Sequence, residues 1–564
     1  MSGRRDRIVI PAAVGAGVAT LAWGYMLAGG NPWSMRLDNL LVMYPMTLEA
    51  YRQLAAGALP VWANGLWGGF PLLADPVTAT FYLPHWLAFL LTPAPHVRAF
   101  DLATAWHLGL LAAGSVAFTR RLGAALLPSI VAGAVIVCGR QVQFWAHSFL
   151  PCIAALAWWP WAMLAAEWLA SEPRGGAAVI LGSVALAAQV LAGYPEFALY
   201  SGTVAAIWVV ARHGAVPRRR RLLRLGVLAV GAAGLAAPQL LPTIADLGDT
   251  FRAGSPTAAN LLRVFVPDLR ALIDPFAPAV VWIGIAPVLL AGVACGQSAG
   301  RLLLGLAVAG ALLSLGDGTP LHGWLRQIPP YGLFRGPHKF FTITELALVW
   351  AAALGGTALW QRPGRVAQMI GALLLAVLVV ERGVGFTVED RLVAGRMPDE
   401  LPIAAMLSLL DEDVLGAYPT AAPDSPPPRL LVYAPNIRLG NVPMVRGLEQ
   451  LGGGTTALLP PRHQALLRAP VSPALMDLFG VQVVWLPGPA CVQSWGYEVL
   501  HRSPRGCLLR NPRRPARYAL GVPYEAVATV SALEARTASR VNLLDPVWCS
   551  PRPPRCRRLA PLAR

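Results

Sequence analysis

The chain has 564 residues, of which 55% are hydrophobic and 13% are charged, and its mean hydropathy is +0.53. A soluble domain is roughly a quarter charged, so this composition excludes an ordinary soluble protein and indicates an integral membrane protein. The net charge of +17 comes almost wholly from arginine, because Lys339 is the only lysine. The arginines cluster in short loops between apolar runs, as topology signals do, and we therefore expect no nucleic-acid partner.

Long apolar runs alternate with polar loops through the first two thirds of the chain. Runs of roughly 17 to 22 apolar residues can cross a bilayer as helices, and they predict an α-helical polytopic membrane protein with about eleven spans. The basic stretch from Met1 to Ile10 precedes the first run, and no small-residue cleavage site closes that run at Ala28, so we expect an uncleaved first helix. The predicted spans are residues 8–28, 97–118, 124–139, 150–170, 177–193, 197–211, 222–242, 279–295, 301–315, 340–360 and 367–386.

The placement of arginine predicts the orientation, because short cytoplasmic loops are enriched in basic residues. Arg4, Arg5 and Arg7 place the N-terminus in the cytoplasm. The other predicted turns on that side are basic as well: Arg120 with Arg121, Arg174, Arg212 with Arg218 to Arg221 and Arg224, Arg301, and Arg362 with Arg365. An odd number of spans then leads to a C-terminal segment outside the cytoplasm. We expect a multi-pass protein of the inner (cytoplasmic) membrane.

Two domains follow from this pattern. Residues 1–387 form the predicted transmembrane domain, with long outer loops at 29–96, 243–278 and 316–339, and residues 388–564 form an extracytoplasmic soluble domain.

The extracytoplasmic tail differs in composition from the rest of the chain. It is rich in Pro and Arg, and alternating apolar runs at 429–433, 480–485 and 496–500 predict strands. We therefore expect a small α/β or mostly β domain. Four cysteines lie in it: Cys491, Cys507, Cys549 and Cys556. In an exported domain they either form two disulfides or stay free thiols.

Asp38 stands just past the first predicted span, in an apolar setting, and the amphipathic segment 40–54 that follows is expected to lie along the membrane surface. A carboxylate at that depth is partly desolvated, which raises its pKa and makes it a better general base. Two structural alternatives stay open at this point. Asp38 either caps the following helix or pairs with Arg36.

Four groups of residues, in chain order, carry a family resemblance. The first lies in the first outer loop: Asp38, Tyr44-Pro45, Gly57 to Trp62, Asn64, Gly68-Gly69-Phe70-Pro71, and Tyr82 near Pro84. The others are Gly193-Tyr-Pro-Glu196 with Tyr200, then Phe334-Arg-Gly-Pro-His-Lys339, then Leu478 to Val484 with Leu509 to Arg517. This order resembles the YfhO-like bacterial membrane proteins, which belong to the GT-C-type glycosyltransferase superfamily. Ala63 interrupts the family's Trp-Asn pair, and Tyr194 and Glu196 replace its His and Gln.

The resemblance implies a GT-C-like transmembrane domain that transfers a sugar on the outer membrane face. The donor would be a polyprenyl-phosphate-linked sugar, and the acceptor an envelope glycan, a glycolipid or an exported protein. Asp38 would be the general base that deprotonates the acceptor hydroxyl. Glu196, at a Pro turn beside a span, would be a second catalytic acid or would accept a hydrogen bond from a sugar hydroxyl.

The lipid-phosphate leaving group needs fixed cations near the membrane surface. The candidates are Arg335 and Lys339, four residues apart at the mouth of a span, with His338 between them and Arg140 from another outer loop. For basic residues at span ends, the alternative is that their side chains reach toward lipid headgroups. For Arg140, the alternative is an ion pair with Glu196 or with a lipid phosphate. Two carboxylates in a further outer loop, Asp246 and Asp249, are weaker candidates for a functional role.

Polar and aromatic residues of the outer loops are candidates for sugar or acceptor contact. They are Tyr44, Trp62, Asn64, Tyr82, His147 and Tyr194. For the aromatic residues of these loops, an interfacial aromatic belt is the more common explanation. Some GT-C enzymes use a divalent metal, but no close acidic pair and no His/Cys cluster indicates one, so we expect no metal site and no cofactor.

Two other functions fit the same composition. A lipid-linked sugar flippase or other transporter should carry ionisable residues deep within its spans, whereas the predicted spans are almost uncharged at their centres, with His107 as the main exception. A non-catalytic partner in cell-envelope polysaccharide assembly, with the tail as its binding module, is the third possibility.

Overall fold

The computed structural model describes residues 2–247, 283–334, 336–396, 402–418, 428–432, 440–453, 473–478, 480–487, 496–513, 524–526 and 547–549. The chain divides into two compact units. The helical unit comprises Met1–Asn39, Pro76–Ala245 and Gly254–Asp399, and the sheet unit comprises Leu40–Asp75, Asp246–Ala253 and Glu400–Arg564. Each unit is described by itself.

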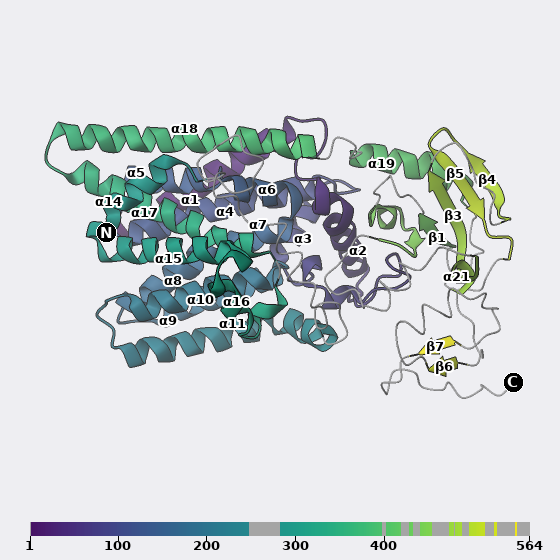
Figure 1. The fold of residues 1–564 in the computed structure, drawn as a ribbon, viewed down its shortest axis with the longest axis horizontal. Helices are drawn as coiled ribbons and strands as arrows, with labels where there is room; N and C mark the ends of the chain where they lie inside the picture. The colour runs from purple at the N-terminus through teal and green to yellow at the C-terminus, as the bar shows by residue number, and fades with distance from the viewer. Residues whose placement is uncertain are drawn as a thin grey trace. The chain divides into compact units, whose positions relative to one another are not determined.

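Helices that run side by side make up the helical unit (Figure 1). They are α1 (Ser2–Leu27), α3 (Leu83–Leu90), α4 (Ala99–Arg121), α5 (Leu126–Ile136), α6 (Arg140–Ser148), α7 (Leu150–Leu156), α8 (Trp159–Ser171), α9 (Gly176–Leu191), α10 (Pro195–Ala211), α11 (Arg218–Leu247), α14 (Ile285–Val293), α15 (Ser298–Ser314), α16 (Pro320–Arg326), α17 (Phe341–Gln361) and α18 (Arg365–Arg396). Each predicted span overlaps one of these helices or, at 150–170, the consecutive α7 and α8; the first residues of the predicted span 279–295 lie outside the described residues.

Six of the described helices are long and apolar enough to cross a membrane, and the pair α5 and α6, bent by 44°, makes a seventh candidate. Four further apolar helices, α9, α10, α14 and α15, are shorter. The predicted class of a helical protein with several apolar spans is confirmed. The predicted number of eleven spans stays a prediction.

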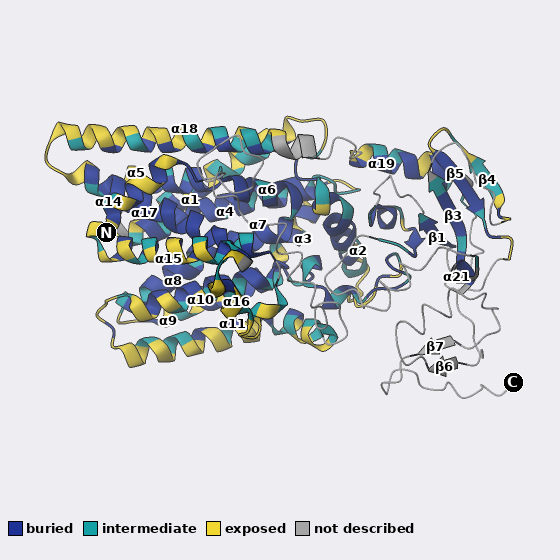
Figure 2. Cartoon of the chain, viewed as in Figure 1, coloured by how far each residue is buried: buried dark blue, intermediate teal, exposed yellow. Residues whose placement is uncertain are grey.

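The apolar side chains of the outer helices face outward, whereas α17 is enclosed. Within the apolar window of each helix, 94% of the residues of α17 are buried, against 28% for α18 and 11% for α1. Figure 2 shows the same contrast, with α11 and α18 largely exposed. Leu21, Val230 and Val366 are each more than 70% exposed. Large apolar side chains in such numbers on outer helices fit a surface covered by lipid.

Small residues let the helices of the core approach closely. A Cβ atom on Gly109 of α4 would lie 2.5 Å from the carbonyl oxygen of Gly15 on α1. A Cβ atom on Gly355 of α17 would lie 1.8 Å from the carbonyl oxygen of Leu290 on α14. Glycine is therefore required at both crossings, as is common where membrane helices pack backbone against backbone.

A five-stranded mixed sheet forms the centre of the sheet unit. Its strands are β1 (Arg429–Val432), β2 (Glu449–Gln450), β3 (Val481–Pro487), β4 (Glu498–Arg502) and β5 (Gly506–Arg510), in the order β2-β1-β3-β5-β4. Strand β1 is parallel to both neighbours, and β5 is antiparallel to β3 and β4. The predicted strands at 429–433, 480–485 and 496–500 are confirmed by β1, β3 and β4.

Further short elements accompany the sheet. They are α19 (Ile403–Leu409), α21 (Pro473–Leu478), and β6 (Tyr524–Ala526) paired in parallel with β7 (Val547–Cys549). Cys507 of β5 is buried and disulfide-bonded.

The amphipathic segment after Asp38 belongs to the sheet unit. It forms α2 (Tyr44–Ala55), which packs against the 3₁₀ turn Val442–Arg446. Arg52 donates hydrogen bonds to the carbonyls of Met444 (3.0 Å) and Val445 (2.6 Å). Its apolar face is covered by protein, and its expected position along the membrane surface stays a prediction.

Candidate functional site

Two charged side chains meet where α10 and α17 begin. Lys339 Nζ lies 2.7 Å from Glu196 Oε2, and the Tyr200 hydroxyl donates a 2.7 Å hydrogen bond to the other carboxylate oxygen. The side chains of Glu196 and Lys339 are 3% and 16% exposed. Pro195 starts α10 with a φ angle that suits a first helical turn, and Tyr200, four residues after Glu196, therefore lies on the same face. The predicted residues Glu196 and Lys339 form one ion pair.

The ring of Tyr194 lies under the lysine. Lys339 Nζ is 5.0 Å from the centre of that ring, within the range of a cation–π contact. Burial first, and then the neighbouring Cys152 and Glu196, raise the pKa of the Tyr194 hydroxyl, which therefore stays protonated. Tyr194 thus supports the ammonium with its ring face.

Asp38 contributes, with Lys339 and Glu196, to the electrostatic environment of the buried Cys152 thiol on α7. Asp38 keeps accessible surface, yet burial by the surrounding protein raises the pKa of its carboxyl. The expectation of a partly desolvated carboxylate agrees with this environment.

Hydrogen bonds on both sides fix the backbone around Asp38. Before it, the amide and the hydroxyl of Ser34 donate to Asp101 of α4, at 2.8 and 2.6 Å. After it, the Asn39 side chain donates to the His147 carbonyl (3.1 Å) and accepts from the Leu150 amide (2.6 Å). The short loop that carries Asp38 is therefore tied to α4, α6 and α7.

The two structural alternatives for Asp38 do not form. In the part of the chain that the structure describes, the Asp38 carboxylate makes no hydrogen bond and no ion pair. It neither caps the helical turn that follows nor pairs with Arg36, so both alternatives are wrong. A carboxylate held in place but not engaged is available to a ligand.

A second set of charges lies along α18. Arg140 pairs with Glu389 (3.5 Å, both side chains fully buried), and His147 Nε2 lies 3.3 Å from Asp390 Oδ1. The Trp33 indole donates to the same Asp390 oxygen (3.2 Å), and its ring packs on His147 at 3.6 Å between centroids. The expected pairing of Arg140 with Glu196 is therefore wrong, because Glu389 takes that place. These positions favour structural roles for Arg140 and His147.

Two of the remaining candidates are Tyr82, which lies apart from the ion pair, and His338, which serves it through its backbone. Tyr82 is buried, and its hydroxyl is shared with His107 Nε2 (2.8 Å) and the Trp158 indole (2.7 Å). Its predicted contact with sugar is not favoured, because the hydroxyl is already used. The His338 carbonyl accepts a 3.0 Å hydrogen bond from Gln141, which holds the turn that presents Lys339.

Three predicted contacts belong to the sheet unit. Tyr44 is fully buried, so the prediction that it contacts sugar is wrong for this conformation. Trp62 is 50% exposed, and Asn64 is exposed as well; both stay predictions. Arg335 and Asp249 lie outside the described residues, and Asp246 lies in the last turn of α11.

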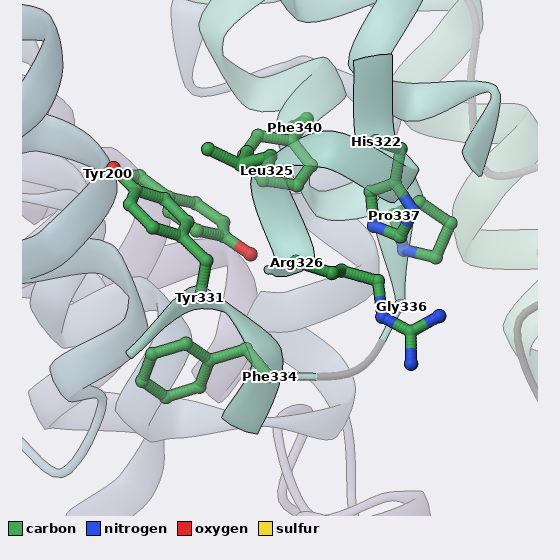
Figure 3. Close-up of a pocket in the computed structure, with 9 residues that line it drawn as sticks. All are labelled: Tyr200, His322, Leu325, Arg326, Tyr331, Phe334, Gly336, Pro337 and Phe340. Atoms are coloured by element: carbon green, nitrogen blue, oxygen red, sulfur yellow. The ribbon is translucent and has the colours of Figure 1, made fainter. Parts of the chain in front are cut away.

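A small recess adjoins the ion pair within the helical unit (Figure 3). It encloses about 220 Å³ of empty space, counting space open to solvent, and is lined by Tyr200, His322, Leu325, Arg326, Tyr331, Phe334, Gly336, Pro337 and Phe340. The Tyr200 ring stacks on Phe340 (4.3 Å between centroids) and Tyr331 (6.1 Å). Tyr200 therefore belongs to the recess wall through its ring and to Glu196 through its hydroxyl.

Sequence reasoning missed several of these residues. Glu389 and Asp390 follow the last apolar run directly, and Glu389 is seven residues after Arg382, so they lie two helical turns apart on one face. That spacing could have predicted that one face of α18 carries charged residues in ion pairs. No comparable signal pointed to Cys152 or Asn39. Among the described residues, no three His, Cys, Asp or Glu side chains gather in a way that could hold a metal ion.

The comparisons with known proteins concern the fold. No family model matches the chain, and no curated protein matches it. The arabinofuranosyltransferase AftD from Mycobacteria is similar in structure, with a TM-score of 0.54, 17% identity, and coverage of 92% of this chain and 41% of that one. A variant of the same enzyme gives a TM-score of 0.59 at 16% identity, covering 92% and 43%.

A crystal structure of ArnT from Cupriavidus metallidurans is also similar, with a TM-score of 0.49 at 12% identity, covering 88% of this chain and 97% of that one. The chain spans less than half the length of AftD. At these identities the likeness is one of fold alone: the chain is folded like the matching part of AftD. The narrower resemblance to YfhO-like proteins stays a prediction.

Proposed function

We propose that the protein is a membrane glycosyltransferase that moves a sugar from a polyprenyl-phosphate-linked donor to an acceptor on the extracytoplasmic face. The observation that carries the proposal is the buried, oriented ion pair of Lys339 with Glu196, in a fold like that of AftD. Transfer from a phosphate-linked donor requires a general base and a fixed cation. We assign the first role to Asp38 and the second to Lys339.

The proposed step is a single displacement with inversion. The acceptor oxygen attacks the anomeric carbon of the donor sugar while Asp38 takes the proton of the acceptor hydroxyl. The bond between the anomeric carbon and the phosphate oxygen breaks, and the electron pair leaves with the lipid phosphate. Lys339 stabilises that charge, and Glu196 keeps the ammonium oriented before the donor binds and accepts a hydrogen bond from a sugar hydroxyl.

Two observations support an extracytoplasmic position for the sheet unit: the placement of basic residues and a disulfide-bonded cysteine. The predicted cytoplasmic turns are basic, and the disulfide-bonded Cys507 of the sheet unit fits an oxidising compartment. Cys295, an exposed free cysteine in a predicted cytoplasmic turn, is a built-in reporter. A membrane-impermeant maleimide added to intact cells should label a Trp62→Cys variant and should reach Cys295 only after permeabilisation. The opposite pattern would reverse the proposed orientation.

A transfer assay tests the activity. The purified protein in nanodiscs should transfer label from polyprenyl-phosphate sugars, and Asp38→Asn should lower the rate by about 10²–10⁴-fold, as loss of a general base does. Glu172→Gln is the matched control, because Glu172 is a half-exposed carboxylate that pairs with Arg121 away from the site. Equal rates in wild type and Asp38→Asn would remove Asp38 from the proposal.

A flippase for lipid-linked sugars is the second candidate, and one observation favours it. Buried ion pairs lie between membrane helices, including Arg382 with Glu345 at 2.6 Å, and transporters place ionisable groups at such depth. Movement of a labelled lipid-linked sugar across proteoliposomes without transfer would favour this function. Neither movement nor transfer by the purified protein would favour a non-catalytic partner in envelope assembly.

A further inference from the structure

The start of the short helix α6 holds the turn that presents Lys339. Gln141, in the first turn of α6, is buried, and its side-chain nitrogen donates a 3.0 Å hydrogen bond to the His338 carbonyl. Its side-chain oxygen lies 3.4 Å from the Thr342 hydroxyl, in the first turn of α17. An amide that donates on one side and accepts on the other is fixed in orientation. Gln141 therefore fixes the backbone from which the Lys339 side chain extends.

The end of α6 holds the loop that carries Asp38. The His147 carbonyl accepts a 3.1 Å hydrogen bond from the side chain of Asn39, the residue after Asp38. The His147 ring packs on the Trp33 ring, with 3.6 Å between centroids, and its Nδ1 lies 3.3 Å from the Trp33 carbonyl. The loop is therefore held to the end of α6 on both sides of Asp38.

Two consecutive carboxylates of α18 hold α6 in turn. The two helices pack against each other (Figure 1). Glu389 pairs with Arg140, the first residue of α6, and Asp390 Oδ1 lies 3.3 Å from His147 Nε2 in its last turn. The same oxygen of Asp390 accepts a 3.2 Å hydrogen bond from the Trp33 indole. One atom of Asp390 therefore joins α18, the end of α6 and the loop after α1.

We propose that α6 sets the spacing between the two reacting groups of the transferase. Gln141 is the positioning residue for Lys339, and Asp390 is the positioning residue for Asp38. Contacts at the two ends of one helix can place a base and a cation from distant parts of the chain, because groups supported by a regular element are held precisely. The inference rests on the proposed function for the roles of Asp38 and Lys339, and it adds two residues that support them.

Two buried glutamines on α6 provide a matched test at its start. Gln143 is also buried, but its side-chain nitrogen donates to the Val137 carbonyl, at the end of α5. Methionine has a similar volume and no amide. Gln141→Met should raise the donor KM and lower kcat/KM roughly tenfold, the effect of one lost hydrogen bond. Gln143→Met should lose a similar amount of stability and keep the kcat/KM of wild type. Equal kinetic losses in the two variants would overturn the role of Gln141.

A conservative substitution tests the role of Asp390. Asp390→Leu removes the acceptor for the Trp33 indole and should lower kcat by roughly ten- to a hundredfold, because a small displacement of a reacting group is costly. The donor KM should stay that of wild type. Asp390→Asn keeps a side-chain oxygen at this place and should retain most of the rate. Equal losses of kcat in the two variants, or a change in donor KM alone, would overturn this role.

Hydrogen–deuterium exchange measures both positions without sugar transfer. Exchange of the Lys339 amide, which closes the 3₁₀ turn, should be roughly tenfold faster in Gln141→Met than in wild type and unchanged in Gln143→Met. Exchange of the Asn39 amide should be faster in Asp390→Leu and close to wild type in Asp390→Asn. Unchanged exchange in Gln141→Met and Asp390→Leu would overturn the inference at any level of activity. The expected exchange rates in a protein that transfers no sugar would refute only the proposed function.

Discussion

Lys339 Nζ and Glu196 Oε2 lie 2.7 Å apart, and this ion pair joins the first turn of α10 to the 3₁₀ turn Pro337–Phe340 that precedes α17. The two positions are 143 residues apart in the chain. Because Tyr200 holds the second oxygen of Glu196 and Tyr194 lies under Lys339, the pair is oriented from both sides. Substituting each residue in turn therefore measures how much Lys339 and Glu196 each contribute to stability.

Removing the lysine should cost more stability than removing the carboxylate. Lys339→Met leaves the carboxylate of Glu196 buried with no cation, which costs roughly 3–5 kcal/mol. Glu196→Gln keeps an acceptor for Tyr200 and leaves an ammonium that still reaches water, so the loss should be smaller. The free energy of unfolding in detergent, followed by tryptophan fluorescence, measures both. The double variant should recover most of the loss of Lys339→Met, and strictly additive losses would argue that the pair is not coupled.

The raised pKa of Asp38 predicts opposite effects on activity and stability. An aspartic acid ordinarily has a pKa of about 3.9, and burial raises that of Asp38. The folded protein then binds this proton more tightly than the unfolded chain does. The stability contributed by the group is present below the ordinary pKa and is lost as the pH rises through the raised pKa.

The test is a comparison of melting temperature with pH. The melting temperature of wild type should fall relative to that of Asp38→Asn as the pH rises from about 4 to 8. At neutral pH the inactive variant should therefore be the more stable protein. Transfer by wild type should rise over the same interval, because the base must be ionised. Parallel melting curves for the two proteins would show that Asp38 is not desolvated.

Asn39 should act as a positioning residue for Asp38. Asn39→Ala removes the hydrogen bonds to the His147 carbonyl and from the Leu150 amide. The loss of such buried hydrogen bonds costs about 1–3 kcal/mol of stability. We expect a lower kcat with little change in the donor KM, because Asp38 moves while the donor contacts stay. An effect on KM alone would place Asn39 in donor binding instead.

Arg140 should be replaceable together with its partner. Arg140→Met leaves Glu389 buried without its cation, and the loss of stability should be roughly 3–5 kcal/mol. The double variant Arg140→Met/Glu389→Met should regain stability and keep most of the transfer activity. A folded double variant that no longer binds polyprenyl phosphate would instead support the predicted role of Arg140 as a phosphate ligand.

The helices were predictable because the apolar runs that form them are local. The runs at 177–193 and 340–360, for example, correspond closely to α9 and α17. The end of α18 was not predictable, since Glu389 and Asp390 interrupt the apolar run at its end. Glu389 pairs with Arg140, and Asp390 lies 3.3 Å from His147. Both partners come from a helix more than two hundred residues earlier.

Long-range contacts also explain the errors about the first loop. The amphipathic spacing of α2 predicted only that one face would be covered, and in the folded chain the turn Val442–Arg446 packs against this helix. Asp38 was proposed as a base on a resemblance, with a cap and a pairing with Arg36 left open. Only the folded chain shows that its neighbours, Ser34 and Asn39, are the anchored residues.

Because the chain has a single lysine, that side chain can be labelled selectively. Reagents that acylate lysine have a single side-chain target in the whole chain, Lys339, and that amine is shielded by its partner and by an aromatic ring. Its modification therefore records how often the shielding opens, in the unsubstituted protein and in native membranes. Protection by an added substrate would report occupancy of the pocket around this one amine without any assay of product.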